Sequence, residues 1–286
     1  MDAFHLHLSD AWDHLSAQRF RSGSLLKFGN PRRKQRGEQA IAALKETIGR
    51  IVHARRQSKH EASDLLAMLM SARDEESGDG LSDQELIDEV MTLVIAGHET
   101  TASALTWTLH CLALNPAWID RIREEVKSFP NGPWPMEVFR QLDVTGRVLQ
   151  EGMRLFPPVW TFGRRTLDAI QLGEFLLPSD TSVTMPLVGI HRHAKSWSHP
   201  DSFNPDHFLP DAVQSRPKFA YFPFGGGQRM CIGSHYAMME MQCVLARLLN
   251  ALDIELTGPR NPSLSALVTL QPGVPLPCVF KPRKSS

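Results

Sequence analysis

FGGGQRMCIG, at residues 224–233, brings three consecutive glycines, an arginine and a cysteine together within ten residues. Glycines such as residues 225–227 adopt positive φ angles easily and let the backbone approach a flat or bulky group closely. Cys231 comes just before residues 234–252, which are predicted to form a helix that Gly233 opens. A helix N-terminus offers free N–H donors and the positive end of the helix dipole. This setting favours a thiolate, which acts as a nucleophile or as a metal ligand.

The stretch matches the pattern F-x-x-G-x-R-x-C-x-G at its five fixed positions, which are Phe224, Gly227, Arg229, Cys231 and Gly233. It resembles the haem-binding loop of the cytochrome P450 family of haem-thiolate monooxygenases. The resemblance implies that Cys231 is the metal ligand, the axial thiolate of haem b (iron protoporphyrin IX). It also implies that Arg229 pairs with a haem propionate, that Phe224 packs near the thiolate, and that Gly225 and Gly233 border the cofactor.

Two other interpretations of Cys231 are open. One is a buried structural cysteine after a glycine-rich turn, which the five matched positions disfavour. The other is a zinc site with His235, but no second ligand pair at the usual spacing accompanies it. The histidines at 191, 193 and 199 lie in a predicted loop without a carboxylate at a convincing spacing, so we interpret them as loop residues.

Residues 81–115 form the second informative stretch, predicted as one long helix. Ser82 and Glu85 fit a capping box at its start, and Pro116 follows its end. Such a helix is about 33 residues and roughly 50 Å long. Its apolar composition predicts that it is buried in the middle of a domain.

The centre of this helix reads AGHETT, residues 96–101. A glycine inside a helix costs about 1 kcal/mol relative to alanine, and adjacent threonines can bend the helix. The segment resembles the oxygen-activation motif of the same family. That resemblance implies that Glu99 and Thr100 are the catalytic acid–alcohol pair that relays protons, and that Gly97 opens a groove for O₂ and water. A kinked helix with a structural polar cluster is the alternative.

Glu151 and Arg154 are spaced to lie on one face of a predicted helix. E-x-x-R followed by two prolines resembles the buried structural motif of the family, which a third residue from the later loop at 203–208 completes. Family members usually carry arginine where this chain has His207. Because histidine titrates near neutrality, we expect a weaker and more pH-sensitive brace. Arg165, with Arg164 as the fallback, matches the position that reaches the second propionate.

Composition limits the classes of function. The chain has 286 residues, with 31 basic and 31 acidic residues, so its formal net charge is zero. This balance argues against binding nucleic acid. The four cysteines show no disulfide pattern, which favours a reducing compartment and a cytoplasmic protein. No apolar run is long enough for a transmembrane segment, and the N-terminus lacks a signal-peptide core.

The fold class expected is mainly α with a small β portion, in a single domain over residues 1–286. Helices are predicted within 1–28, from Gln39 to Arg56, in a short segment near 63–73, in the charged segment after Pro116 and from Val144 to Leu155. Short strands are predicted between Trp160 and Val188 and at the C-terminus. The basic run at 30–38 is predicted as a turn and the acidic segment at 74–80 as a mobile loop. The resemblance covers roughly residues 37–282 and implies a P450-like fold that lacks the family's N-terminal part.

The resemblance implies a haem-thiolate oxidoreductase that monooxygenates a small apolar organic substrate with O₂. No flavin or iron–sulfur motif is present, so an external electron donor, a ferredoxin or a flavin reductase, is implied. One alternative is a catalytically incompetent remnant or weak haem-binding module. A lesser alternative uses peroxide or rearranges an oxygenated substrate, which an intact Glu99 and Thr100 disfavour.

Overall fold

The computed structural model describes residues 3–21, 31–58, 63–130 and 132–283. The chain forms two compact units, Met1–Glu99 and Thr100–Ser286. Helix α4 (Asp83–Leu114) begins in the first unit and ends in the second. Because the chain passes between the units inside one continuous helix, a single folding domain remains our prediction.

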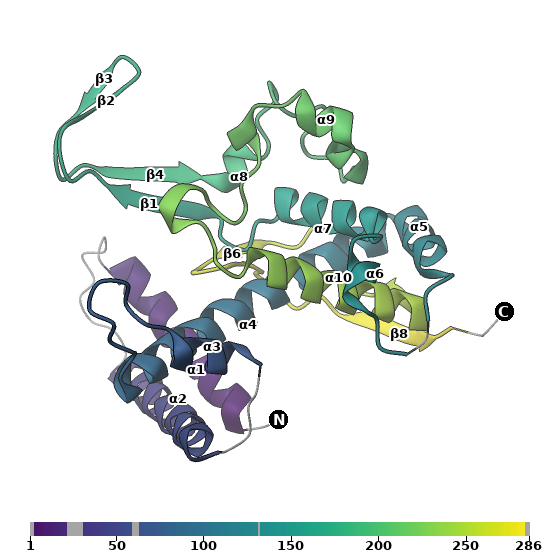
Figure 1. Cartoon of the computed structure of the whole chain (residues 1–286). Coiled ribbons are helices and arrows are strands. Elements are labelled where there is room, and N and C mark those ends of the chain that lie inside the picture. The colour runs from purple at the N-terminus through teal and green to yellow at the C-terminus, as the bar shows by residue number, and fades with distance from the viewer. Residues whose placement is uncertain (1–2, 22–30, 59–62, 131, 284–286) are drawn as a thin grey trace. The chain divides into compact units, whose positions relative to one another are not determined.

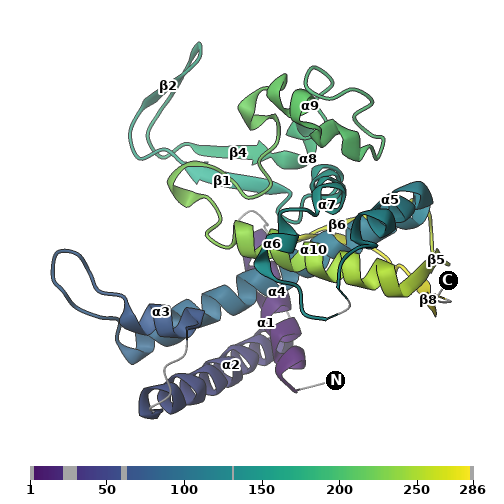
Figure 2. The same ribbon diagram turned by 45° about the vertical axis from the view of Figure 1, so that its right-hand side comes forward.

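The first unit is helical. It consists of α1 (Ala3–Arg21), α2 (Pro31–Gln57), α3 (Leu65–Ser71) and the N-terminal half of α4. Helices α1 and α2 pack side by side (Figures 1 and 2). The buried side chains come from α1, α2 and α4: Leu8, Ala11, Ala40, Leu44, Ile48, Val52, Leu86 and Met91. On α2 they recur every four residues, which places them on one helical stripe.

Several boundaries in this unit differ from expectation. Helix α2 begins at Pro31 rather than Gln39, so the basic run predicted as a turn is helical from Pro31 onward. The reason is that proline fits the first turn of a helix, where no N–H partner is needed. Helix α1 accounts for one predicted N-terminal helix, and the prediction for residues 22–28 lies outside the described residues. In the acidic segment at 74–80, Asp74 accepts hydrogen bonds from the backbone N–H groups of Glu76 and Ser77, and the predicted mobility of this loop remains a prediction.

Helix α4 confirms the long-helix prediction. The backbone N–H of Ser82 donates to Glu85 Oε2 at 2.8 Å, and the N–H of Glu85 donates to Ser82 Oγ at 3.3 Å, so the capping box is formed. The expected burial of the whole helix is wrong for residues 96–98, which are exposed. This turn lies next to the boundary between the units in the sequence, and the buried apolar residues of α4 occur before and after it.

The second unit carries the remaining helices: α5 (Pro116–Val126), α6 (Met136–Phe139), α7 (Asp143–Leu155), α8 (Leu187–Ile190), α9 (Pro210–Gln214), α10 (Ser234–Ala251) and the 3₁₀ turns η1 (Pro205–Phe208), η2 (Lys218–Ala220) and η3 (Gly227–Arg229). Its core joins side chains of α4, α5, α7 and α10: Ala104, Leu112, Ile119, Ile122, Val148, Leu149, Met153, Met241, Leu245 and Leu249. The core therefore fixes α10, the helix that follows Cys231, against α7.

The described strands form two-stranded antiparallel sheets: β1 (Thr161–Arg165) with β4 (Ser182–Pro186), β2 (Ile170–Leu172) with β3 (Phe175–Leu177), β5 (Leu252–Leu256) with β8 (Cys278–Pro282), and β6 (Leu264–Ala266) with β7 (Leu270–Pro272). Hairpin β2–β3 lies at the tip of the β1–β4 ribbon (Figure 1). A mainly α fold with a small β portion is thus confirmed. Among the described residues, no helix is long and apolar enough to cross a membrane.

Candidate functional site

The cysteine loop, residues 224–233, turns through two left-handed glycines. Gly225 has φ = 77° and Gly227 has φ = 72°, whereas Gly226 is extended at −162°. The backbone N–H of Cys231 donates to the carbonyl oxygen of Phe224 at 2.8 Å and closes the loop. Positive φ is therefore confirmed for two of the three glycines. These two glycines allow the backbone to turn within the loop.

Cys231 is exposed at the surface of this loop, and the side chain of the adjacent Ile232 is 91% exposed. The interpretation of Cys231 as a buried structural cysteine is therefore wrong. Helix α10 begins three residues later, at Ser234. Over the residues that the structure describes, no group of three or more His, Cys, Asp or Glu side chains could hold a metal ion. A site for a metal that is already part of a larger cofactor needs only the single thiolate.

Strand β1 lies next to the cysteine loop. The ring of Phe162 comes within 3.5 Å of the position that a Cβ on Gly225 would take. The guanidinium of Arg164 lies 6.0 Å from the centre of the same ring, because alternate residues of a strand share a face. Arg165 points to the other face and forms an ion pair with Asp180. The propionate role of Arg165 remains a prediction, and the structure favours the fallback residue Arg164 for the face toward the loop.

The remaining predicted loop residues are placed as follows. Arg229 ends the turn η3 and is exposed, and Phe224 is partly buried against the core of the second unit. An added Cβ on Gly227 or Gly233 would meet nothing within 4 Å. The loop therefore leaves open space beside its backbone, as a backbone that borders a bulky group requires.

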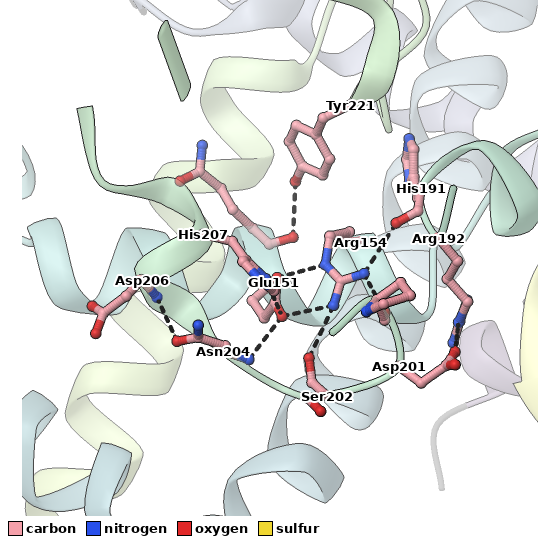
Figure 3. Close-up of polar contacts among 12 residues, drawn as sticks. Glu151, Arg154, His191, Arg192, Asp201, Ser202, Asn204, Asp206, His207 and Tyr221 are labelled. Carbon is pink, nitrogen blue, oxygen red and sulfur yellow. Dashed lines mark hydrogen bonds and ion pairs between the residues drawn. The ribbon is translucent and has the colours of Figure 1, made fainter. Parts of the chain in front are cut away.

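Glu151, Arg154 and His207 form the predicted brace, and the Glu151–Arg154 pair lies at its centre (Figure 3). Arg154 Nε donates to Glu151 Oε2 at 2.7 Å and Nη2 donates to Oε1 at 2.8 Å, and both side chains are 0% exposed. This bidentate geometry is the strong form of an ion pair. The predicted structural motif is therefore present and buried.

Arg154 directs its other donors to the segment that follows α8. Nη1 donates to the carbonyl oxygens of His191 at 3.0 Å and Pro200 at 2.6 Å, and Nη2 donates to that of Ser202 at 3.0 Å. Burial favours a raised pKa for Glu151, but the hydrogen bonds from Arg154 and His207 outweigh it, so its pKa lies below the usual value. The carboxylate is charged and fully partnered inside the protein.

His207 completes the brace from η1. Its Nδ1 donates to Glu151 Oε1 at 3.1 Å, and its Nε2 donates to the carbonyl oxygen of Ser198 at 2.8 Å (Figure 3). Because both partners are acceptors, both bonds form together only when the ring is the imidazolium. His207 thus occupies the place where the resemblance expects an arginine, and the expected weakness and pH sensitivity of the brace remain predictions.

The sequence did not indicate that the side chains of His191 and Tyr221 connect the brace to the segment just before the cysteine loop. The backbone N–H of Phe222 donates to His191 Nε2 at 3.1 Å, and the hydroxyl of Tyr221 donates to the carbonyl oxygen of Gln150 at 3.0 Å. Burial, and then the positive charge of Arg154, lowers the pKa of His191 to about 3, so this ring is neutral. The only sequence signal was the position of Tyr221 and Phe222 directly before the loop.

The AGHETT segment is divided by the boundary between the units. Gly97 and Glu99 lie in the first unit and Thr100 in the second. Glu99 and Thr100 are partly buried, whereas Gly97 is exposed, with nothing within 4 Å of an added Cβ. The predicted groove at Gly97 and the roles of Glu99 and Thr100 remain predictions.

A family model described as cytochrome P450 matches residues 1–276. This chain belongs to the cytochrome P450 family. The P450 relatives include cyclooctatin synthase of Streptomyces melanosporofaciens, which is 39% identical over 216 residues, covering 75% of this chain and 47% of the relative. Pentalenene oxygenase of Streptomyces avermitilis is 33% identical over 208 residues, covering 72% of this chain and 46% of the relative. The chain thus spans about half the length of the curated P450 relatives it matches.

Solved structures that resemble this chain are also cytochrome P450 proteins. The crystal structure of the cytochrome P450DA heme domain aligns with a TM-score of 0.89 at 25% identity, over 99% of this chain and 62% of that one. P450 proteins are haem-thiolate proteins, and the donor set here suits haem b. Cys231 carries an exposed thiol, a soft sulfur donor of the type that haem-thiolate proteins use, on an open glycine-bearing loop just before α10.

Proposed function

We propose that the protein is a haem-thiolate monooxygenase that inserts one oxygen atom from O₂ into a small apolar organic substrate. The observation that carries the proposal is the exposed thiol of Cys231 on a loop closed by its own hydrogen bond to Phe224. A fully buried ion pair, Glu151–Arg154, belongs to the brace, and Tyr221, just before the loop, bonds to the carbonyl oxygen of Gln150 next to that pair. Surrounding hydrogen bonds and packing keep a metal-binding side chain in one orientation, and metal binding depends on that orientation.

Cys231 would hold the haem iron, and Arg229 and an arginine of β1 would pair with its propionates. Arg164 shares the face of Phe162, and Phe162 lies against the cysteine loop, so Arg164 is the favoured partner on this strand. When bound, the thiolate-ligated haem supplies the redox chemistry that cleaves the O–O bond. Gly225, Gly227 and Gly233 let the backbone run alongside the cofactor.

The residues of α4 supply protons. Glu99 and Thr100 follow each other on α4, and both side chains are partly buried. A carboxyl group exchanges protons with solvent, and a hydroxyl group can both donate and accept a hydrogen bond. The pair would therefore pass protons from the surface to the reaction site through the side-chain oxygens of Glu99 and Thr100.

The apolar substrate is supported by the names of relatives. These include pentalenene oxygenase and cyclooctat-9-en-7-ol 5-monooxygenase, which is 32% identical over 215 residues. Electrons would come from a separate ferredoxin or flavin reductase, because no flavin or iron–sulfur motif occurs in this sequence. The balanced charge and the cysteine usage support a cytoplasmic protein that binds no nucleic acid.

The first test is the absorption spectrum of the reduced, haem-supplied protein under carbon monoxide. We expect a strongly red-shifted Soret band, since thiolate ligation changes the electron density at the iron. Cys231→Ala should abolish that band. Cys243→Ala is the matched control, because Cys243 lies on α10 after the loop and should leave the band in place.

An unshifted band for the unaltered protein, or a red-shifted band that survives in Cys231→Ala, would contradict the proposal. A red-shifted band without any oxygenation of substrate, in the presence of an electron donor, would instead support the alternative of a haem-binding module without oxygenase activity.

A further inference from the structure

Arg216 lies against the brace from a segment that the family motif does not include. It follows α9 and comes five residues before Tyr221. Its Nη2 donates to the carbonyl oxygen of His207 at 2.8 Å, and its guanidinium lies 3.7 Å from the centre of the Trp197 ring. The guanidinium of Arg154 lies 4.8 Å from the same ring. Trp197, which is 2% exposed, thus contacts two cations.

Glu151 is the one acidic side chain with 0% exposure in the described ion pairs. It interacts electrostatically with both Arg154 and Arg216. Among the described residues, Glu151 from α7 bonds to the ring of His207, and Arg216 from the segment after α9 bonds to its carbonyl oxygen. Arg154 on α7 and Tyr221 before the cysteine loop interact electrostatically with Glu151, and Asp206 lies next to His207 on the same turn. Asp206 is already paired with Arg147 and Arg121.

The buried charge of Glu151 therefore has one permanent partner on α7 and a second partner that depends on pH. When the imidazole of His207 is neutral, its Nδ1 can still donate to Glu151 and its Nε2 can accept from Ser198 Oγ, 3.4 Å away, but the ring contributes no charge. A guanidinium stays charged across this whole range. Arg216 is half-buried and is held by an aromatic ring and a backbone carbonyl, so its charge is fixed close to the brace.

We infer that Arg216 is a positioning residue that supplies the permanent positive charge which histidine at position 207 cannot. Through Arg216, the brace stays formed when His207 is neutral, and Tyr221 and the cysteine loop stay in place. This inference deepens the proposed function, since the braced loop is the one proposed to hold haem. It concerns the folded chain itself, and its main readout needs no haem.

The test is urea unfolding of the 286-residue chain, followed by far-UV circular dichroism at pH about 6 and about 8.5, on either side of the usual imidazole range. Arg216→Gln should raise the unfolding equilibrium constant about tenfold at the higher pH, as expected for the loss of one charge-assisted contact. The effect should be about threefold or less at the lower pH, where the imidazolium of His207 compensates. Arg216→Lys keeps the charge but loses the stacked guanidinium, so its loss should be similar at both pH values and smaller than that of Arg216→Gln at the higher pH.

Rescue distinguishes the charge of Arg216 from its packing. Adding His207→Arg to Arg216→Gln should restore stability at pH about 8.5 and remove the pH dependence of the loss. Arg247→Gln is the matched control. Arg247 stacks on Trp134 at 4.0 Å and donates to the carbonyl oxygen of Gly132, so its loss should be equal at both pH values.

An equal loss for Arg216→Gln at both pH values would overturn the inference, as would a failure of His207→Arg to rescue it. If Arg216→Gln alone does not fold, a double variant that also fails to fold counts against the inference. Urea unfolding tests the inference, and the carbon monoxide spectrum tests the proposed function. Either one can therefore fail without the other.

Discussion

At the level of single residues, burial decides how much an ion pair contributes. Glu151 with Arg154 and Glu124 with Lys127 share the same spacing of three residues on a helix. The first pair is fully buried, whereas the side chains of the second are 75% and 72% exposed. Breaking a buried pair typically costs about 3–5 kcal/mol because a charge is left uncompensated, whereas an exposed pair contributes about 0–1 kcal/mol.

His191 gives a prediction for pH dependence. Its pKa is about 3 in the folded chain, below the usual 6.5, because it is buried beside Arg154. As the pH falls below 6.5 the unfolded chain binds a proton that the folded chain refuses, so stability is lost, by up to about 1.4 kcal/mol per pH unit. In His191→Gln, the amide oxygen can still accept from the N–H of Phe222 but does not titrate. Urea unfolding between pH about 7 and about 5 should therefore show a flatter profile for the variant.

His193→Gln is the control for this experiment, because His193 is exposed in the same segment. It should keep the slope of the unaltered protein. Identical slopes for His191→Gln and the unaltered protein would show that His191 is not held neutral.

At the level of elements, the cysteine loop depends on backbone conformation. Gly227 and Gly233 both have open space where an added Cβ would lie, but only Gly227 has positive φ, at 72°, whereas Gly233 has φ = −87°. Gly227→Ala should lower the free energy of unfolding by about 1 kcal/mol, the cost of a left-handed conformation for an L-residue. Gly233→Ala should change it by less than about 0.5 kcal/mol.

Urea unfolding of the two glycine variants side by side measures this difference. Equal losses in the two variants would mean that side-chain volume, and not backbone conformation, limits substitution in the loop.

At the level of the whole molecule, α4 connects the two units without a break. If the chain is a single folding domain, unfolding curves from circular dichroism and from tryptophan fluorescence should coincide. Ala102 is exposed on α4 just after the boundary. Ala102→Pro removes a helical hydrogen bond there and costs about 3 kcal/mol or more, so it should separate the curves into two transitions.

Ala102→Ser keeps the helix and serves as the control for this variant. Two transitions already present in the unaltered protein would show that the units fold independently and that the single-domain prediction is wrong.

The family could be assigned from the sequence alone, because the motif residues have fixed local spacings. The pattern around Cys231, the capping box of Ser82 and Glu85, and the long helix α4 are all local features, set by backbone conformation and by side chains a few residues apart. The pairing of Glu151 with Arg154 could be predicted for the same reason.

The residues that support the site from a distance became visible only in the folded chain. His191, Arg216 and Tyr221 contact the brace and the loop across many residues of sequence, and no local pattern marks them. The structure also showed that Arg164, rather than Arg165, shares the face of Phe162, because a shift of one residue along a strand reverses the direction of a side chain. Burial, pKa shifts and contacts between distant segments arise only when the chain is folded. The sequence motif therefore could not show which distant residues support the cysteine loop.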